Sequence, residues 1–323
     1  MTAAPETRPP LHVPVMLERV VDLLAPALGH SGAVYADLTL GLGGHAEAIL
    51  RRCPEARLLG LDRDEQALAR AGERLAPFGG RVTLVHAVFD EFPQVLADQG
   101  LTAVDAILLD LGLSSLQIDD RSRGFAYAQD APLDMRMGRD DGLTAADIVN
   151  TWPAADLAHL FHDYADERHS RRIAAAIAAA RAEAPFTSSA RLVDVIAGAI
   201  PAAQRSSGGH PAKRVFQALR MAVNRERETL AAVLPAALAG LAVGGRLAVL
   251  AYHSGEDRLV KRAFAAATAD QAPAGLPTVP DHLAARFRPL TAGAERPCPA
   301  ELAGNPRSAP ARLRAVTRTK EPA

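Results

Sequence analysis

The sequence predicts an α/β fold: a doubly wound, mostly parallel, Rossmann-like sheet with an inserted all-helical subdomain. Three observations support this fold class. Short apolar segments of strand length alternate with segments of helical periodicity over the first 110 residues, as in a parallel sheet whose strands are joined by helices. Three of these strands end in an aspartate. Residues 144–200 are helical in pattern throughout and offer no strand candidate.

The first half of the chain shows the alternation most clearly. A leading helix is expected over residues 13–28, because apolar residues recur at helical spacing, Pro14 suits the first turn and Gly29 suits the end. The strands that follow are expected over residues 33–36, 57–62, 81–86 and 104–110, and the helices from residue 44, over residues 64–75 and from residue 89.

The second half returns to the α/β pattern after the helical stretch. The expected elements are one continuous helix over residues 213–242, a turn at Gly244 and Gly245, a strand over residues 246–252 and a helix over residues 255–267. We expect Ser254 and Asp257 to form the capping box of this last helix. A final strand over residues 312–318 could pair with residues 286–290 at the sheet edge.

These elements divide the chain into three segments. We expect a first part of the core domain over residues 1–118, an inserted helical subdomain for substrate recognition over residues 119–212, and a second part of the core with a basic C-terminal tail over residues 213–323.

Composition limits the function classes. The formal net charge of the 323 residues is −1, so no global field draws the protein to nucleic acid, and such binding must come from local patches. Cys53 and Cys298 are isolated from each other and from metal-ligand spacings, which favours a reducing compartment. We therefore expect a cytoplasmic protein without a metal site or membrane association.

Two local basic clusters could contact phosphates. Lys213, Arg214 and Arg220 follow one another without an intervening acid, and Arg312 and Arg314 belong to a tail with the same property. Either cluster could equally be solvated surface, and the sequence leaves both interpretations open.

A glycine-rich loop follows the first strand. Gly41, Gly43 and Gly44 let the backbone approach a ligand, and the helix that begins there presents free N–H groups, as in nucleotide-binding α/β proteins. The spacing Gly41, Gly43, Ala46 also fits the dinucleotide fingerprint, with Asp62 about twenty residues further on. A nicotinamide cofactor is therefore one interpretation.

Asp37 favours a different cofactor. Its carboxylate lies just ahead of the glycines, where it would repel a pyrophosphate and attract an amino group or a sulfonium. S-adenosylmethionine is the common cofactor with that charge. Asp37, Asp62 and Asp110 should all lie at the carboxyl edge of the sheet. Asp62 can accept the ribose hydroxyls, and Phe89 either packs on the adenine or belongs to the core.

Several sequence blocks together resemble a known family: ADLTLGLGGH, LGLDRD, ILLDLGLSS, RGFAYAQDAPLDMRM, HPAKRVFQALR, AYHSGEDRLVKR and NPRSAPARLR. They are similar to the bacterial ribosomal RNA small subunit methyltransferase H family, also called MraW-like. The resemblance implies a class I methyltransferase sheet, S-adenosylmethionine as cofactor, and methylation of N4 of a cytidine in the decoding region of 16S rRNA. The implied partner is the 16S rRNA of the small ribosomal subunit.

The resemblance also implies site residues. The implied cofactor contacts are Gly43, Gly44, His45, Asp62, Phe89, Asp110 and Gln117. The chain departs from the family at Leu38, Leu42 and Gly255, and Leu38 could reshape the first turn of the glycine loop.

The chemistry of the implied reaction points to Asp110. The exocyclic amine of cytosine is a poor nucleophile, so a carboxylate must pull on an N4–H while the amine is held in line with the methyl group. Asp134 and His253 are further candidates that would grip the base. Methylation at C5 would need a cysteine nucleophile, and neither cysteine lies in a strand-end motif.

Two alternatives to a cytosine-N4 methyltransferase stay open on sequence grounds. One is an NAD-dependent oxidoreductase on the same Rossmann sheet, and the other is a non-catalytic RNA-binding module. Whether the chain forms a homodimer is also left open.

Overall fold

The computed structural model describes residues 14–127, 130–138, 142–202, 210–273 and 279–321. It divides into two compact units. The sheet unit comprises Met1–Asp62, Gln66–Gly112 and Leu234–Ala323, and the helical unit comprises Arg63–Glu65 and Leu113–Val233. The helical unit is therefore longer at both ends than the expected insertion over residues 119–212. The difference arises because Val215, Phe216 and Leu219 belong to the core of the helical unit.

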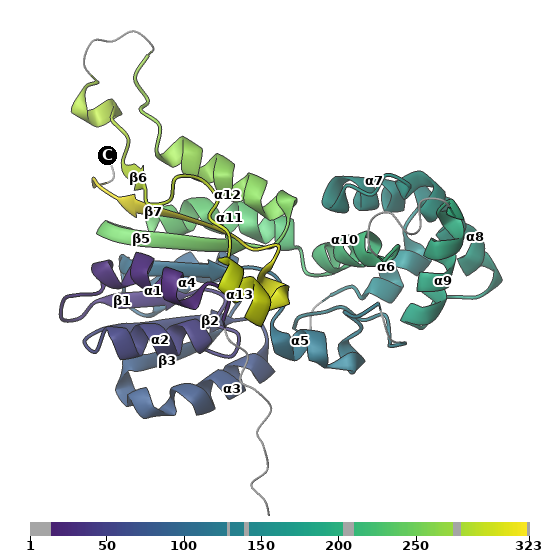
Figure 1. The fold of residues 1–323 in the computed structure, drawn as a ribbon, viewed down its shortest axis with the longest axis horizontal. Coiled ribbons are helices and arrows are strands. Elements are labelled where there is room, and N and C mark those ends of the chain that lie inside the picture. Colours follow the sequence, from purple (N-terminus) through teal and green to yellow (C-terminus); the bar gives the residue numbers. More distant parts are fainter. Residues whose placement is uncertain (1–13, 128–129, 139–141, 203–209, 274–278, 322–323) are drawn as a thin grey trace, which may run out of the picture. The chain divides into compact units, whose positions relative to one another are not determined.

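A seven-stranded sheet forms the centre of the sheet unit, in the order β3-β2-β1-β4-β5-β7-β6 (Figure 1). The strands are β1 (Val34–Asp37), β2 (Arg57–Asp62), β3 (Val82–His86), β4 (Val104–Asp110), β5 (Leu241–Ala251), β6 (Phe287–Pro289) and β7 (Arg312–Arg318). The first five are parallel, and β7 runs antiparallel to β5 and β6. The predicted Rossmann-like class and the predicted pairing of the last two strands are confirmed.

The helices of this unit are α1 (Leu17–Leu24), α2 (Gly44–Arg52), α3 (Glu65–Leu75), α4 (Phe92–Asp98), α12 (Ser254–Ala267) and α13 (Pro299–Gly304). Side chains alternate between the two faces of the strands. Leu108 and Leu250 share one core with Val20 and Ile49 of α1 and α2, while their neighbours, among them Ile107, are buried on the other face. Burying each such side chain contributes about 1.5–3 kcal/mol.

Two expected features differ in the structure. The expected helix over residues 213–242 is two helices, α10 (Lys213–Val223) and α11 (Glu226–Ala239). They are separated because Arg225 adopts a left-handed conformation with φ 51°. The expected turn at Gly244 and Gly245 is a distortion within β5, where the register against β4 shifts. The strand therefore begins at Leu241, ahead of the glycines.

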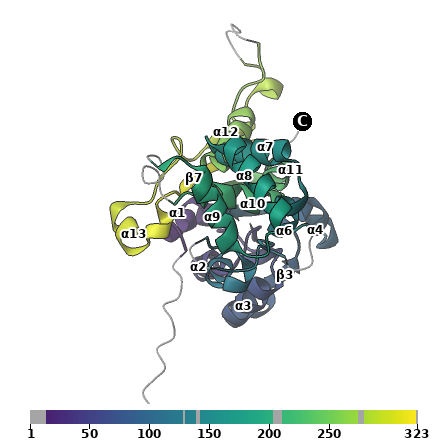
Figure 2. The same ribbon diagram turned by 90° about the vertical axis from the view of Figure 1, so that its right-hand side faces the viewer.

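The helical unit contains α5 (Ser115–Asp119), α6 (Ala145–Thr151), α7 (Ala154–Ala165), α8 (Ser170–Glu183), α9 (Ser189–Ala199) and α10. Figure 2 shows α6 to α10 gathered into one bundle. Phe161, Ile173, Phe186 and Leu192 are fully buried in its core. This bundle matches the helical pattern expected for residues 144–200.

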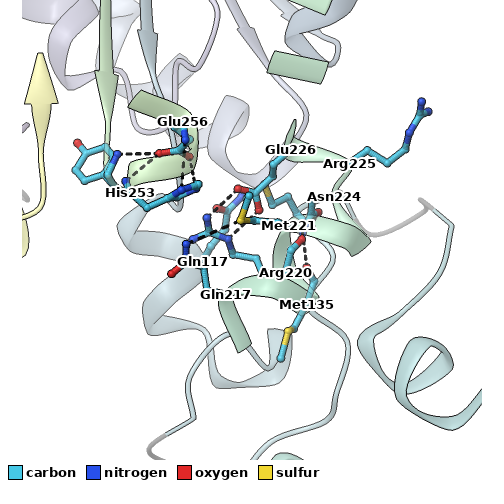
Figure 3. Close-up of polar contacts among 12 residues, drawn as sticks. Gln117, Met135, Gln217, Arg220, Met221, Asn224, Arg225, Glu226, His253 and Glu256 are labelled. Atoms are coloured by element: carbon cyan, nitrogen blue, oxygen red, sulfur yellow. Dashed lines mark hydrogen bonds and ion pairs between the residues drawn. The ribbon is translucent and has the colours of Figure 1, made fainter. Parts of the chain in front are cut away.

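A buried ion pair ties the loop regions of the helical unit together. The side chains of Arg123 and Asp64 are 4% and 3% exposed, and Arg123 Nη1 lies 2.7 Å from an Asp64 carboxylate oxygen. Arg123 also donates to the backbone oxygen of Met137 at 2.9 Å. Asn224 links these loops a second time: its side-chain amide donates to Met135 O (Figure 3) and accepts from Met137 N–H.

Among the described residues, no helix has both the length and the apolar character needed to span a membrane.

Candidate active site

Asp110 ends β4 at the carboxyl edge of the sheet, and three groups fix it. Its Oδ1 accepts a hydrogen bond from the Tyr252 hydroxyl at 2.7 Å, and its backbone N–H donates to Thr39 Oγ1 at 2.6 Å. Its Oδ2 lies 3.7 Å from His45 Nδ1, and its side chain is 25% exposed. The carboxyl group is therefore held in place while part of it still reaches the surface.

Burial raises the pKa of Asp110 to about 7, even though the Tyr252 hydroxyl lowers it, and the charge of Glu256 adds to the rise. A carboxyl group with such a pKa is a better proton acceptor than an ordinary aspartate. The same burial and the nearby Asp110 raise the pKa of the Tyr252 hydroxyl well above its usual value. Tyr252 therefore stays protonated and donates.

His45 is buried at the start of α2. Its Nε2 lies 3.0 Å from Val15 O, and the backbone carbonyl can only accept, so this nitrogen carries the hydrogen. Burial lowers the pKa of His45, although the charge of Asp37 opposes that change. The ring is therefore held in one tautomer, with Nδ1 turned to Asp110.

Asp37 ends β1 and is only 1% exposed. Its two carboxylate oxygens accept from the Tyr35 hydroxyl at 2.7 Å and from Thr39 N–H at 3.2 Å. Burial raises its pKa to about 6, against the effect of Tyr35, His45 and Thr39. The structure thus gives Asp37 partners inside the protein, and its direct contact with a cofactor stays a prediction.

The glycine loop closes on the end of β2. Gly41 N–H donates to Asp62 Oδ2 at 2.7 Å, so the loop and the predicted ribose-binding acid lie together. Gly41 and Gly43 have φ of +53° and +73°, values that favour glycine. A Cβ at Gly44 would lie 2.4 Å from Pro14 Cγ, so the packing on Pro14 also favours glycine there, and the predicted cofactor contact of Gly44 stays a prediction.

The two other predicted cofactor contacts, Phe89 and Gln117, belong to different units. Phe89 is in the sheet unit and begins a short helical turn, Phe89–Glu91. Ala87, two residues earlier, donates its N–H to Asp62 O, so Phe89 lies a short way along the chain from a residue hydrogen-bonded to the predicted ribose-binding acid. Gln117 belongs to the helical unit. Its buried amide accepts from Ser114 N–H and donates to Asp64 Oδ2 at 3.1 Å. Its predicted contact with the cofactor stays a prediction.

His253, which was predicted to grip the base, is engaged in capping a helix, and its predicted role stays a prediction. His253, not Ser254, is the N-cap of α12, and its Nδ1 accepts from the N–H groups of Gly255 and Glu256 at 3.2 and 3.4 Å. Its Nε2 lies 3.2 Å from Glu256 Oε1 (Figure 3). The helix cap is therefore one residue earlier than expected. Glu256, rather than Asp257, accepts a backbone hydrogen bond ahead of the helix, from Tyr252 N–H, and Asp257 accepts from Arg314 instead.

The third predicted catalytic residue, Asp134, lies in the helical unit. It accepts hydrogen bonds from the backbone and guanidinium of Arg136. Burial opposes this, but the Arg136 contacts prevail and hold the pKa of Asp134 below its usual range. Asp134 is therefore a weak base, and its predicted role in gripping a nucleotide base is untested.

The predicted RNA contacts fall into two groups. Lys213 and Arg214 are exposed. The other three pair with acids: Arg220 with Glu226 at 2.8 Å, and Arg312 and Arg314 with Asp257 at 3.3 and 2.7 Å. The tail arginines are far from acids in sequence, but the fold brings them to α12.

Tyr252 and Thr39 were missed as functional residues by the sequence analysis. Tyr252 stands inside the AYHSGED block, directly after β5, so its place at the carboxyl edge was available from the strand pattern. Its contact with Asp110 joins residues 142 positions apart and has no local signal.

The sheet order, the glycine loop after β1 and the acid that ends β4 form a Rossmann-like sheet of the kind that class I methyltransferases have. Residues 10–319 match the profile of the MraW methylase family, and the chain belongs to this family. It is 58% identical over 312 residues to the ribosomal RNA small subunit methyltransferase H of Nocardioides sp., covering 97% of this chain and 98% of the relative. It is 55% identical over 312 residues to the protein of the same name from Streptomyces avermitilis, with the same coverage.

Proposed function

We propose that this chain is an S-adenosylmethionine-dependent methyltransferase that methylates N4 of a cytidine in the 16S rRNA of the small ribosomal subunit. Membership of the MraW methylase family supports methyl transfer over the NAD-dependent and non-catalytic alternatives. The names of the relatives support RNA of the small ribosomal subunit as the substrate.

The donor set of the sheet unit fits this cofactor. Asp37, Asp62 and Asp110 place three acids at neighbouring strand ends, which suits a cationic ligand better than a pyrophosphate. Asp62 would hold the ribose hydroxyls, and Gly43 at the start of α2 would face the methionyl end. S-adenosylmethionine supplies an electrophilic methyl group on its sulfonium. Buried Asp37 would act through its charge.

Asp110 is the observation that carries the choice of nitrogen as methyl acceptor. It is a fixed, partly exposed carboxyl group whose pKa burial raises to about 7. As an ionised carboxylate it would accept an N4–H and so free the lone pair of the amine. Cys53 is buried at the end of α2, and Cys298 is the N-cap of α13, so neither follows a strand of the sheet as a C5 nucleophile would.

Lys213 and Arg214 are the best candidates for phosphate contacts. Both are exposed, and among the residues that the structure describes neither forms an ion pair that would have to break first; Arg214 donates only to the backbone oxygen of Asp166 there. Arg220, Arg312 and Arg314 are already paired with acids and would contribute less.

The test is methyl transfer from labelled S-adenosylmethionine to small subunits purified from a strain without its own enzyme, followed by nucleoside analysis. We expect label in N4-methylcytidine. The exposed variant Asp98→Ala serves as a control and should keep activity. Label in 5-methylcytidine would contradict the assignment to nitrogen. A rise in melting temperature with NAD instead of S-adenosylhomocysteine would contradict the cofactor.

A further inference from the structure

His45 faces Asp110 with a lone pair. Its Nε2 must carry a hydrogen, because the partner 3.0 Å away is the carbonyl oxygen of Val15. A neutral ring therefore has no hydrogen on Nδ1, the nitrogen 3.7 Å from Asp110 Oδ2. The contact thus sets a lone pair against a carboxyl oxygen at 3.7 Å, which is longer than a hydrogen bond, so the two atoms must move closer before they can share a proton.

The position of that proton follows from the other contacts of Asp110. Its Oδ1 already accepts the Tyr252 hydroxyl hydrogen at 2.7 Å. An added proton therefore belongs on Oδ2, the oxygen nearest His45 Nδ1. The buried pair has two forms with one proton, one with a neutral acid and neutral ring and the other with a carboxylate and an imidazolium.

The charged and titratable groups around the pair come from three other elements and from the residue that follows β5. They are Asp37 on β1, Glu256 on α12, Glu301 on α13, and the two phenols Tyr35 and Tyr252. The acids favour a proton on this pair. Burial opposes a charged ring, and it also opposes a charged carboxylate.

Resting on the proposed function, we propose that His45 is a positioning residue that shares, through Nδ1, the proton that Asp110 Oδ2 takes from N4 of cytidine. One N4–H bond breaks, one N4–methyl bond forms, and the methyl–sulfonium bond breaks. The released proton goes to Asp110 Oδ2, and His45 Nδ1 accepts it from there when the two atoms approach, until water removes it. The Val15 carbonyl keeps Nε2 protonated and thereby leaves Nδ1 open.

The pair can be tested in the ligand-free protein by ¹⁵N NMR of the histidine rings, with the His45 signals assigned from the variant His45→Gln. We expect Nε2 to be protonated and Nδ1 bare above pH 8. The Nδ1 signal should titrate with the Asp110 carboxyl group, and this titration should vanish in Asp110→Asn. A bare Nε2, or an Nδ1 signal that ignores Asp110→Asn, would overturn the proposal whatever the protein methylates.

Kinetics separate this role from simple cofactor binding. The side-chain amide of His45→Gln can still donate to Val15 O but cannot take up a proton. We expect its kcat at saturating S-adenosylmethionine to fall about 100-fold, the lower end of general acid–base effects. Exposed His30→Gln is the matched control. If kcat recovers fully at saturating cofactor and only KM rises, His45 is a cofactor contact alone. If the NMR coupling is present but no substrate is methylated, the proposed function fails instead.

Discussion

Two strand-end acids of the sheet unit and two acids of the helical unit are held in opposite ways. At the carboxyl edge of the sheet, Asp37 and Asp110 accept from tyrosine hydroxyls, and burial raises their pKa values to about 6 and 7. In the helical unit, Asp64 and Asp134 contact arginines. A guanidinium fixes a carboxylate in its charged form, whereas a phenol in a buried place leaves it able to take a proton. The contrast makes the strand-end acids the candidates for proton transfer, whereas acids paired with arginines, such as Asp64 and also Asp257 of the sheet unit, serve the structure.

The largest effect should follow the loss of the acid after β4. Asp110→Ala should lower kcat by at least about 10³-fold, because both the acceptor for N4–H and its position are lost. Asp110→Asn keeps an acceptor oxygen but takes no proton, and it should retain a trace of activity. Single-turnover methyl transfer to small subunits measures both. Near-normal turnover of the alanine variant would show that Asp110 is not the proton acceptor.

Breaking a pair in the helical unit should instead cost stability. Arg123→Met leaves Asp64 buried without its guanidinium and should destabilise that unit by about 3–5 kcal/mol. Hydrogen exchange of amides in α6 to α9 measures this loss within the unit. The double variant Arg123→Met/Asp64→Leu should recover most of it, since no charge is left unpaired. Equal losses in the single and double variants would show that the pair acts only through packing.

Tyr252→Phe tests the effect of the Tyr252 hydroxyl on the pKa of Asp110. The hydroxyl stabilises the carboxylate, so its loss should raise the pKa of Asp110 further above about 7. A hydrogen bond to a charged group is worth about 1.5 kcal/mol, or roughly one pKa unit. Because the reaction needs Asp110 as a carboxylate, activity should rise as the pH rises through the pKa of Asp110. The midpoint of the kcat–pH profile should therefore move up by about one unit, with wild-type turnover regained near pH 9. A profile that keeps its wild-type midpoint would contradict this role.

The smallest effect concerns Asp37. Its pKa in the folded protein, about 6, is raised above the ordinary value of 3.8, so the fold favours the protonated form and loses stability as pH rises between these values. Asp37→Asn should stabilise the sheet unit at pH 8 by about 1–2 kcal/mol, after about 1 kcal/mol is lost with altered hydrogen bonds.

The gain should disappear near pH 4, where Asp37 is protonated in the fold. Melting curves at the two pH values measure it, and exposed Asp22→Asn is the control. A gain of equal size at both pH values would show that the buried charge is not its cause.

Local patterns predicted the elements that depend on local properties. The bounds of β2 and β4 agree with the expected residues 57–62 and 104–110, because each is an apolar run that ends in an acid. The break between α10 and α11 could not be predicted in this way. It occurs at the left-handed Arg225, next to Asn224, whose side-chain amide binds the backbone of Met135 and Met137 in a distant loop.

In the candidate site, too, the features that depend on local sequence were predicted and those that depend on distant contacts were not. The three strand-end acids and the glycine loop were predicted from strand ends and spacing, and the structure places them at one edge of the sheet. The partners that set their chemistry were not predicted, because Tyr252 and His45 reach Asp110 from other strands and helices. The cap of α12 was misjudged because the ring of His253 forms it, a contact that the sequence suggested for Ser254.

The short stretch of chain just ahead of α1 has a consequence for protein engineering. Pro14 packs on Gly44, Val15 O fixes the tautomer of His45, and Met16 N–H donates to Glu301 Oε1 at 2.6 Å. A truncation that begins at Leu17 would remove all three contacts and free the imidazole to rotate, although it deletes no residue of the sheet. A shortened version of the protein should therefore begin ahead of Pro14, so that this stretch is kept.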